Sequence, residues 1–245
     1  MVIYWCFSRY CVAQLQEYTE NPGRYLSAEE LNEYRRFVIP KRKMEWLASR
    51  ILIKRLVIDS VKPTLYLSPR SINIRKRSSG VPYVELARIG KIGWLSMSHS
   101  HNGVLIAFSS NERNPFGVDL EYVEERLPQF IADFFTESES RWVNTSQEEE
   151  KKYLVNLIWS AKETYLKAIG KGLQLDTRRV EIKGVDSRCA ETEWCDLDFQ
   201  ANIQDKRNWR ILFKHEDGFI QTMCIPADKN IKFVRLDVEL EKPFN

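Results

Sequence analysis

Two carboxylates stand two residues apart in the segment 117–121, which reads Gly-Val-Asp-Leu-Glu. Polar and apolar residues alternate there, and this pattern predicts a β-strand with Val118 and Leu120 on the core face and Asp119 and Glu121 on the opposite face. Adjacent carboxylates repel each other unless a hard divalent cation lies between them, and magnesium prefers such oxygen ligands. By itself, however, the pentapeptide is more typical of an ordinary solvated strand face.

A second pair of charged residues, Glu163 and Lys167, stands one helical turn apart. Apolar residues recur around this pair at three- and four-residue steps, namely Leu154, Ile158, Ala161, Tyr165 and Ile169. This spacing predicts a helix with one buried side, which Gly170 or Gly172 is expected to end in a left-handed conformation. A surface Glu–Lys pair is the simpler explanation of the charges, and such a pair contributes only about 0.2–0.5 kcal/mol.

In this order, the two segments resemble motifs of the 4′-phosphopantetheinyl transferase superfamily, in particular of its long, surfactin-type enzymes. Those enzymes carry a Gly-hydrophobic-Asp-hydrophobic-Glu strand and then a Trp-x-x-Lys-Glu-x-x-x-Lys-x-x-Gly-x-Gly-Leu helix. This chain matches both patterns, at residues 117–121 and 159–173, without a mismatch at a defining position. A third family motif, a Ser-His-Ser strand end, stands at residues 98–100.

The resemblance implies an α+β fold of two similar halves that are related by pseudo-two-fold symmetry, with the active site in the cleft between them. Each half is expected to hold a mainly antiparallel sheet packed with a long helix, as in the 4′-phosphopantetheinyl transferase fold. We expect the N-terminal half to span residues 1–110. The C-terminal half, which carries the metal and catalytic motifs, is expected to span residues 111–245.

A weak internal repeat accompanies the resemblance. Residues 27–30 have the pattern of a capped helix start, and residues 134–139 repeat it before the second long helix. Aligning the two long helices pairs Lys54 with Lys167. Strands that complete the second sheet are expected at 179–182, 194–199, 209–213, 219–224 and 233–240.

The family activity is the magnesium-dependent transfer of the 4′-phosphopantetheine arm of coenzyme A to a serine of an apo acyl or peptidyl carrier protein, with release of adenosine 3′,5′-bisphosphate. By resemblance, coenzyme A is then the co-substrate, and Asp119, Glu121 and Glu163 are the magnesium ligands that neutralise charge on the reacting phosphates. The resemblance assigns catalysis to Glu163 and Lys167, with Lys167 meeting a phosphate as a point charge. The serine proton goes either to Glu163 or to a magnesium-bound water.

The resemblance also implies a set of residues that hold coenzyme A. They are Lys41, Arg42, Lys43, Arg50, Gly80, Pro82, Ser98, His99, Asp119 and Lys167. The family usually has Gly-Lys-Pro where this chain has Val81 between the glycine and the proline, so one contact to the coenzyme is lost. Arg75, Lys76 or Arg77 is a candidate to replace it.

Two other functions are compatible with the same residues. A degenerate family member would bind coenzyme A or a carrier protein without turnover. The missing lysine at Val81 favours this alternative, whereas the intact set of three carboxylates argues against it. A magnesium-dependent phosphohydrolase would use the same acidic residues, but it would leave the serine-bearing partner unexplained.

The composition is that of a soluble globular protein. A net charge of +3 over 245 residues is too small to indicate nucleic acid binding. No apolar run approaches the roughly 20 residues that span a bilayer, and the first apolar run, interrupted by Arg9, predicts a strand and not a signal peptide. Five cysteines without zinc-site spacing favour reduced thiols. We therefore expect a cytoplasmic monomer without a nucleic acid or membrane partner.

Overall fold

The computed structural model describes residues 1–61, 67–185, 193–227, 229–241 and 244. Its contacts divide the chain into two compact units. The first unit combines Met1–Arg113 with Asn230–Asn245, and the second unit is Asn114–Lys229. The chain thus leaves the first unit near the predicted boundary at residue 110, but it returns to that unit for its last residues. The prediction that residues 111–245 form one half is therefore wrong for Asn230–Asn245.

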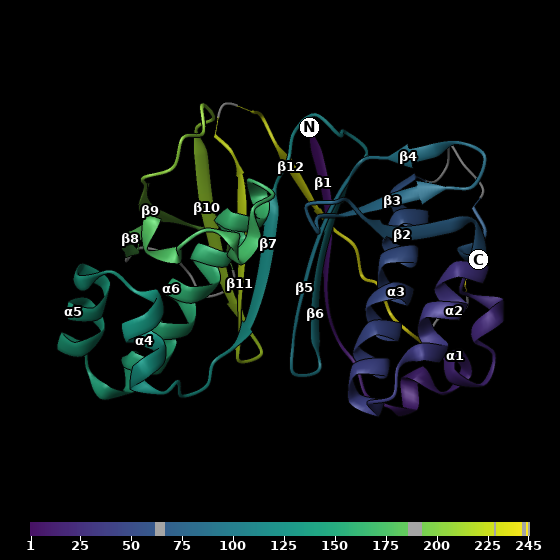
Figure 1. Ribbon diagram of the computed structural model, residues 1–245, viewed down its shortest axis with the longest axis horizontal. Helices are drawn as coiled ribbons and strands as arrows, with labels where there is room; N and C mark the ends of the chain where they lie inside the picture. The colour runs from purple at the N-terminus through teal and green to yellow at the C-terminus, as the bar shows by residue number, and fades with distance from the viewer. Residues whose placement is uncertain (62–66, 186–192, 228, 242–243, 245) are drawn as a thin grey trace. The chain divides into compact units, whose positions relative to one another are not determined.

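The first unit holds two small sheets and one long helix. Its helices are α1 (Gln16–Glu20), α2 (Ala28–Arg36) and α3 (Pro40–Val61), with 3-10 turns at Ala13–Leu15, Pro22–Arg24 and Pro69–Ser71. Its strands are β1 (Val2–Arg9), β2 (Ile72–Lys76), β3 (Pro82–Leu86), β4 (Gly90–Ile92), β5 (Trp94–Ser100), β6 (Gly103–Ser109) and β12 (Lys232–Arg235). The strand orders are β12-β1-β6-β5 and β2-β3-β4, and among the described strands of this unit only the β1–β12 pairing is parallel (Figure 1).

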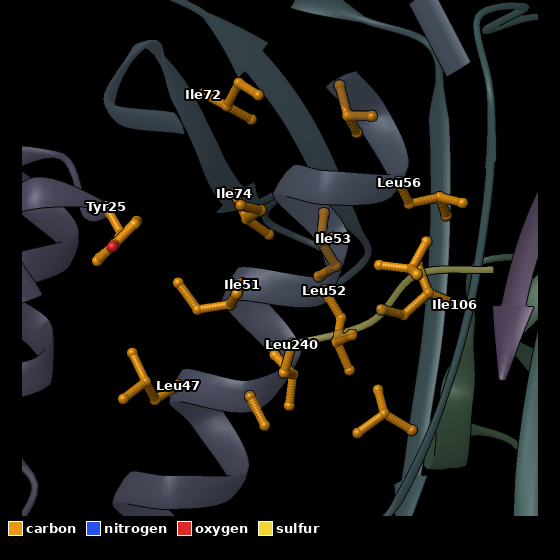
Figure 2. Packing of buried hydrophobic residues seen from close by; sticks show 14 of the residues in the cluster. Tyr25, Leu47, Ile51, Leu52, Ile53, Leu56, Ile72, Ile74, Ile106 and Leu240 are labelled. Carbon is orange, nitrogen blue, oxygen red and sulfur yellow. The ribbon is translucent and has the colours of Figure 1, made fainter. Parts of the chain in front are cut away.

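The central part of α3 is buried on all sides. Every residue from Leu47 to Ile58 is buried. Figure 2 shows the apolar side chains of this helix among those of the sheets, including Ile74 of β2 and Ile106 of β6. Burial on α3 is not confined to apolar residues but extends to charged ones, including Arg50 and Lys54.

The C-terminal segment completes the core of the first unit. The backbone N–H of Leu236 donates to the carbonyl of Trp5 over 2.9 Å, and Val238 and Leu240 are buried in the same cluster as α3 (Figure 2). The prediction that residues 233–240 belong to the second sheet is wrong. Their hydrogen-bonding partner is β1, which lies at the other end of the sequence.

The second unit is one five-stranded antiparallel sheet packed with a long helix. Its helices are α4 (Pro128–Phe134), α5 (Glu137–Thr145) and α6 (Glu148–Ala168), with 3-10 turns at Gly172–Gln174 and Thr177–Arg179. Its strands are β7 (Gly117–Tyr122), β8 (Val180–Val185), β9 (Cys195–Ala201), β10 (Trp209–Glu216) and β11 (Phe219–Pro226), in the order β7-β11-β10-β9-β8. The α6 helix packs on β7, β8, β10 and β11. The predicted α+β class is confirmed.

The two units share the order of their elements, from a first strand through short helices and a long helix to antiparallel strands. Both α2 and α5 begin with a capping box, whose acidic members are Glu30 and Glu139. Each of these glutamates also pairs with a buried lysine of the long helix, Lys54 in α3 and Lys162 in α6. Lys54 therefore corresponds to Lys162 and not to Lys167, so the predicted register of the repeat is wrong. The pseudo-two-fold relation of the halves stays a prediction.

No helix in the described ranges is long and apolar enough to cross a membrane. Cys6, Cys11 and Cys224 are free thiols, whereas Cys195 is disulfide-bonded. The expectation of reduced cysteines is therefore wrong for Cys195, and Cys189 lies outside the described residues.

Candidate functional site

The strand β7 approaches the helix α6 so closely that only glycine fits at position 117. A Cβ atom on Gly117 would lie 2.0 Å from the carbonyl oxygen of Thr164 and 2.7 Å from the backbone nitrogen of Ala168. The glycine that begins the strand motif therefore allows β7 to lie against α6. As a result, Asp119 and Glu121, the next polar residues of β7, reach side chains of this helix.

Gly170 ends α6 directly after its last charged turn. Its φ of 71° is left-handed, and the N–H groups of Gly170 and Lys171 donate back to the carbonyls of Lys167 and Leu166 over 3.0 Å each. This is the Schellman arrangement that glycine permits, and it confirms one of the two predicted helix ends. The helix stop fixes the backbone around Lys167.

Asp119 is buried, with 1% of its surface exposed, and both of its oxygens are engaged. The ammonium of Lys167 lies 2.6 Å from Oδ1, and the hydroxyl of Ser160 donates to Oδ2 over 2.7 Å. Lys167 also lies 3.5 Å from the carboxylate of Glu163. The predicted residues Asp119, Glu163 and Lys167 thus meet in one network between β7 and α6.

Glu121 is held from two sides. The indole N–H of Trp159 donates to its Oε1 over 2.9 Å, and the guanidinium of Arg126 donates to its Oε2 over 2.8 Å. Trp159 is in turn packed edge-on against Phe130 of α4, with ring centroids 4.9 Å apart. The tryptophan of the helix motif therefore orients a carboxylate of the strand motif.

Arg126 is a site residue that the sequence reasoning missed. It lies in the loop between β7 and α4, and its Nε donates to the side-chain oxygen of the fully buried Asn156 over 3.0 Å. Asn156 itself donates to the backbone carbonyls of Glu124 and Lys152 over 2.7 Å each. This arrangement ties the loop to α6 and fixes the guanidinium against Glu121. The position of Arg126 in a loop, outside any periodic pattern, gave no signal.

Burial and neighbouring charges shift the pKa values of Glu121, Glu163 and Lys167. Burial and the charge of Asp119 raise the pKa of Glu121 to about 8, against the opposing charge of Arg126. Burial and Asp119 also raise the pKa of Glu163, against Lys167. Burial alone would lower the pKa of Lys167, but the charges of Asp119 and Glu163 outweigh it and raise that pKa above its ordinary value. The ammonium of Lys167 therefore stays charged.

The network fits a divalent cation in its donor chemistry and its charge. Three carboxylates face two cationic side chains, Lys167 and Arg126. Burial first, and then repulsion from Asp119, raises the pKa of Glu121 and Glu163, and a divalent ion would relieve this repulsion. Within the described ranges, no three His, Cys, Asp or Glu side chains already form a group that could hold a metal. An ion at Asp119 would therefore have to displace the ammonium of Lys167.

The basic residues predicted to bind coenzyme A in the first unit do not form one cluster. Arg50 is buried, with its guanidinium 4.6 Å from the ring centroid of Trp46 and its Nε 3.9 Å from the carboxylate of Glu30. Lys41 is exposed, 3.9 Å from Glu45, and Arg42 is exposed as well. Lys43 lies over the ring of Tyr34, 4.4 Å from its centroid.

Arg50 instead borders a pocket of about 390 Å³ in the first unit. The pocket is lined by Glu29, Glu30, Glu33, Arg50, Asn73, Ile74, Arg75, Lys76 and Tyr83. The Nε of Arg50 and the side-chain oxygen of Asn73 are buried there without a hydrogen bond in the part of the chain that the structure describes. Two of the three basic residues named as substitutes for the missing lysine, Arg75 and Lys76, line the same pocket.

The remaining predicted residues lie on turns and strand ends of the first unit. Gly80 has a φ of 85° in the turn between β2 and β3, and Pro82 begins β3. Ser98 and His99 stand near the end of β5, where they pair with β6, and His99 is exposed.

Residues 115–223 match the family model of the 4′-phosphopantetheinyl transferase superfamily. Three curated relatives are 4′-phosphopantetheinyl transferases by name. HetI of Nostoc sp. is 29% identical, over 76% of this chain and 72% of that protein. Sfp of Bacillus subtilis is 28% identical, over 62% of this chain and 69% of that protein. The transferase gsp of Aneurinibacillus migulanus is 28% identical over 61% of this chain, and the alignment spans less than two thirds of that relative, 58% of its length.

Proposed function

We propose that this chain is a member of the 4′-phosphopantetheinyl transferase superfamily and that it transfers the 4′-phosphopantetheine arm of coenzyme A to a serine of an apo carrier protein. The observation that carries the proposal is the network of Asp119, Glu163 and Lys167. These residues come from the two motifs that the superfamily shares. They bring acidic and cationic groups together at one point between β7 and α6.

In the proposed reaction, the hydroxyl oxygen of the carrier serine forms a bond to the phosphorus that bears the pantetheine arm. The bond from this phosphorus to the bridging oxygen breaks, and its electron pair leaves with adenosine 3′,5′-bisphosphate. Negative charge grows on the phosphoryl oxygens and on the leaving group. Catalysis therefore requires positive charge at this place and a group that accepts the serine proton.

Asp119, Glu121 and Glu163 would hold the magnesium ion, which supplies positive charge to the phosphates when it is bound. Trp159 and Arg126 would keep Glu121 oriented toward this ion, since each donates to one of its oxygens. Lys167, when displaced from Asp119, would be free to bind a phosphate oxygen as a charged donor.

Glu163 is the residue that we assign as the acceptor of the serine proton, with a water molecule as the alternative. Burial and the charge of Asp119 raise the pKa of this carboxyl group. In the metal-free protein, this shift brings the carboxyl group closer to the neutral pH at which a general base works best, and a bound cation would reduce the shift. Its distance of 3.5 Å from Lys167 also places acid–base and phosphate-binding groups side by side.

We assign the nucleotide end of coenzyme A to the pocket beside Arg50. The Nε of Arg50 and the amide oxygen of Asn73 are buried and form no hydrogen bond within the described residues, so they offer one donor and one acceptor to a ligand, although this Nε also lies 3.9 Å from the carboxylate of Glu30. Lys76 adds positive charge for phosphate, and Tyr83 adds an aromatic ring. Arg75 would have to exchange its contacts with Glu29 and Glu85, at 2.8 and 2.6 Å, to bind phosphate as well. This assignment keeps Arg50 as a coenzyme-binding residue, whereas Lys41, Arg42 and Lys43 do not line this pocket and remain candidates by resemblance alone.

One assay separates this function from the two alternatives. The protein is incubated with coenzyme A, magnesium and an apo carrier protein, and both the carrier mass and the free nucleotide are measured. A transferase modifies the carrier. A phosphohydrolase releases nucleotide but leaves the carrier unmodified, and a binding module neither releases nucleotide nor modifies the carrier. We further propose that the chain acts as a cytoplasmic monomer, without nucleic acid or membrane.

A further inference from the structure

Asp119 accepts a hydrogen bond from one of two buried hydroxyl groups that contact each other and belong to different elements. Ser160 of α6 donates to its Oδ2 over 2.7 Å, and the hydroxyl oxygens of Ser160 and Thr222 are 2.8 Å apart. Ser160 and Thr222 are fully buried. Thr222 lies on β11 directly opposite Asp119 in the antiparallel pairing with β7. The carboxylate is therefore supported from the helix and from the neighbouring strand at once.

The direction of these hydrogen bonds follows from the number of protons. Each hydroxyl has one proton to donate, and an ionised carboxylate can only accept. Since the proton of Ser160 goes to Asp119, Thr222 is the donor in its contacts with Ser160, and its acceptors there are the hydroxyl oxygen at 2.8 Å and the backbone carbonyl at 3.1 Å. Through these contacts Thr222 lies against Ser160, and Ser160 orients Asp119.

This support separates the roles of the two oxygens of Asp119. Oδ2 is turned toward the buried hydroxyls, whereas Oδ1 is turned toward Lys167 and the charged network. Without Ser160, the buried Oδ2 would lose this donor, and the loss of a hydrogen bond to a buried charged group favours rotation of the carboxylate toward other donors. Rotation would take Oδ1 away from the position that the network requires.

We propose that Ser160 and Thr222 are positioning residues, which fix Asp119 so that its Oδ1 is presented to a divalent cation. The inference rests on the proposed function, because it concerns the ligand set of the same site. Ser160 occupies an unspecified position of the Trp-x-x-Lys-Glu motif, and the motif match assigned no role to it. Partners that orient a metal ligand typically change metal affinity by about 10–100-fold when they are removed.

The test compares Ser160→Ala with Thr164→Val. Thr164 is a matched control, because it is one turn further along α6, is fully buried and donates to the carbonyl of Thr222 over 3.4 Å. Both changes remove one buried hydroxyl, but only the first removes a donor to Asp119. Binding of Mn²⁺ is measured calorimetrically on the protein without coenzyme A, together with the magnesium dependence of carrier modification.

We expect Ser160→Ala to weaken Mn²⁺ binding by about 10–100-fold and to raise the magnesium concentration for half-maximal rate by a similar factor. Saturating magnesium should then restore most of kcat, and Thr164→Val should bind Mn²⁺ like the wild type. Thr222→Val and Thr222→Ser repeat the test from the strand side, and only the valine variant should lose affinity because serine keeps the hydroxyl.

Equal Mn²⁺ affinity in Ser160→Ala and wild type would overturn the inference, as would an equal loss in Thr164→Val. The wild-type measurement tests the proposed function separately. A wild-type protein that binds no Mn²⁺ and modifies no carrier would contradict the proposed function itself. If the wild type binds Mn²⁺ and modifies the carrier, and the Ser160 and Thr222 variants bind Mn²⁺ equally well, only the positioning role is contradicted.

Discussion

The ammonium of Lys162 lies 2.6 Å from the carboxylate of Glu139, and neither side chain is exposed to solvent. The other oxygen of Glu139 accepts the backbone N–H of Ile182, at the start of β8, over 2.8 Å. Lys54 and Glu30 form the same pair at 2.6 Å in the first unit. In the second unit this pair ties α5, α6 and the sheet together, and Glu163 is the next residue after Lys162.

Breaking this pair should destabilise the second unit strongly. Lys162→Met leaves the Glu139 charge buried without its partner, and such a loss typically costs about 3–5 kcal/mol. Adding Glu139→Gln removes the uncompensated charge and keeps a residue type that suits the capping box, so the double variant should recover much of the loss. Urea unfolding of the wild type, the single variant and the double variant measures this. An exposed ion pair contributes at most about 1 kcal/mol. If the free energy of unfolding of Lys162→Met falls by no more than this, the account is contradicted.

Glu163→Gln separates two roles of Glu163. If the residue accepts the serine proton, turnover should fall by roughly 10²–10⁴-fold while magnesium and coenzyme A still bind. If it serves chiefly as a ligand, the metal affinity should fall and added magnesium should restore the rate. Initial rates over a magnesium titration distinguish these outcomes. Substantial recovery at high magnesium would argue against the proton-acceptor role.

The raised pKa of Glu121 predicts how stability depends on pH in the metal-free protein. A carboxyl group whose pKa is higher in the folded state stabilises the fold in its neutral form, fully so below its ordinary value of 4.5. This contribution is lost as pH rises toward about 8. We expect the free energy of unfolding to fall across this window, and to fall less in Glu121→Gln. An unchanged slope in the variant, measured by denaturant unfolding at several pH values, would be inconsistent with this shift.

Leu240→Ala should destabilise the first unit, although the residue lies near the end of the chain. Leu240 is buried in the cluster around α3, and removing such a leucine side chain typically costs about 2–5 kcal/mol. Thermal unfolding measures the loss. The matched variant Leu173→Ala changes an exposed leucine and should leave stability nearly unchanged. Equal effects of the two variants would contradict the packing of the C-terminal segment into this core.

The network of the second unit could be predicted because its residues come from a strand and a helix with regular spacing. Asp119 shares a strand face with Glu121, and Glu163 shares a helix stripe with Lys167, so local periodicity brought each pair together. Arg126 could not be predicted in this way, because a loop residue has no periodic position. Its partners became visible only when β7 and α6 were in contact.

Contacts between distant parts of the sequence account for the wrong predictions. The repeat was aligned through charges four residues apart, but the structural equivalence of Lys54 and Lys162 depends on glutamates more than twenty residues away in each unit. Similarly, the alternation in residues 233–240 predicts a strand but does not specify its partner, which is β1. Arg50 was assigned to coenzyme A by resemblance, and the residue spacing did not predict that α3 is buried on all sides around it.

The most direct test of the proposed transfer is the stoichiometry of its two products. Wild-type protein is incubated with coenzyme A, magnesium and an apo carrier protein, and intact mass spectrometry is combined with quantification of adenosine 3′,5′-bisphosphate. We predict one nucleotide for each phosphopantetheine attached, no modification of a carrier whose acceptor serine is replaced by alanine, and no reaction with Asp119→Asn. Nucleotide release without a modified carrier, or modification that persists in Asp119→Asn at the wild-type rate, would contradict the account.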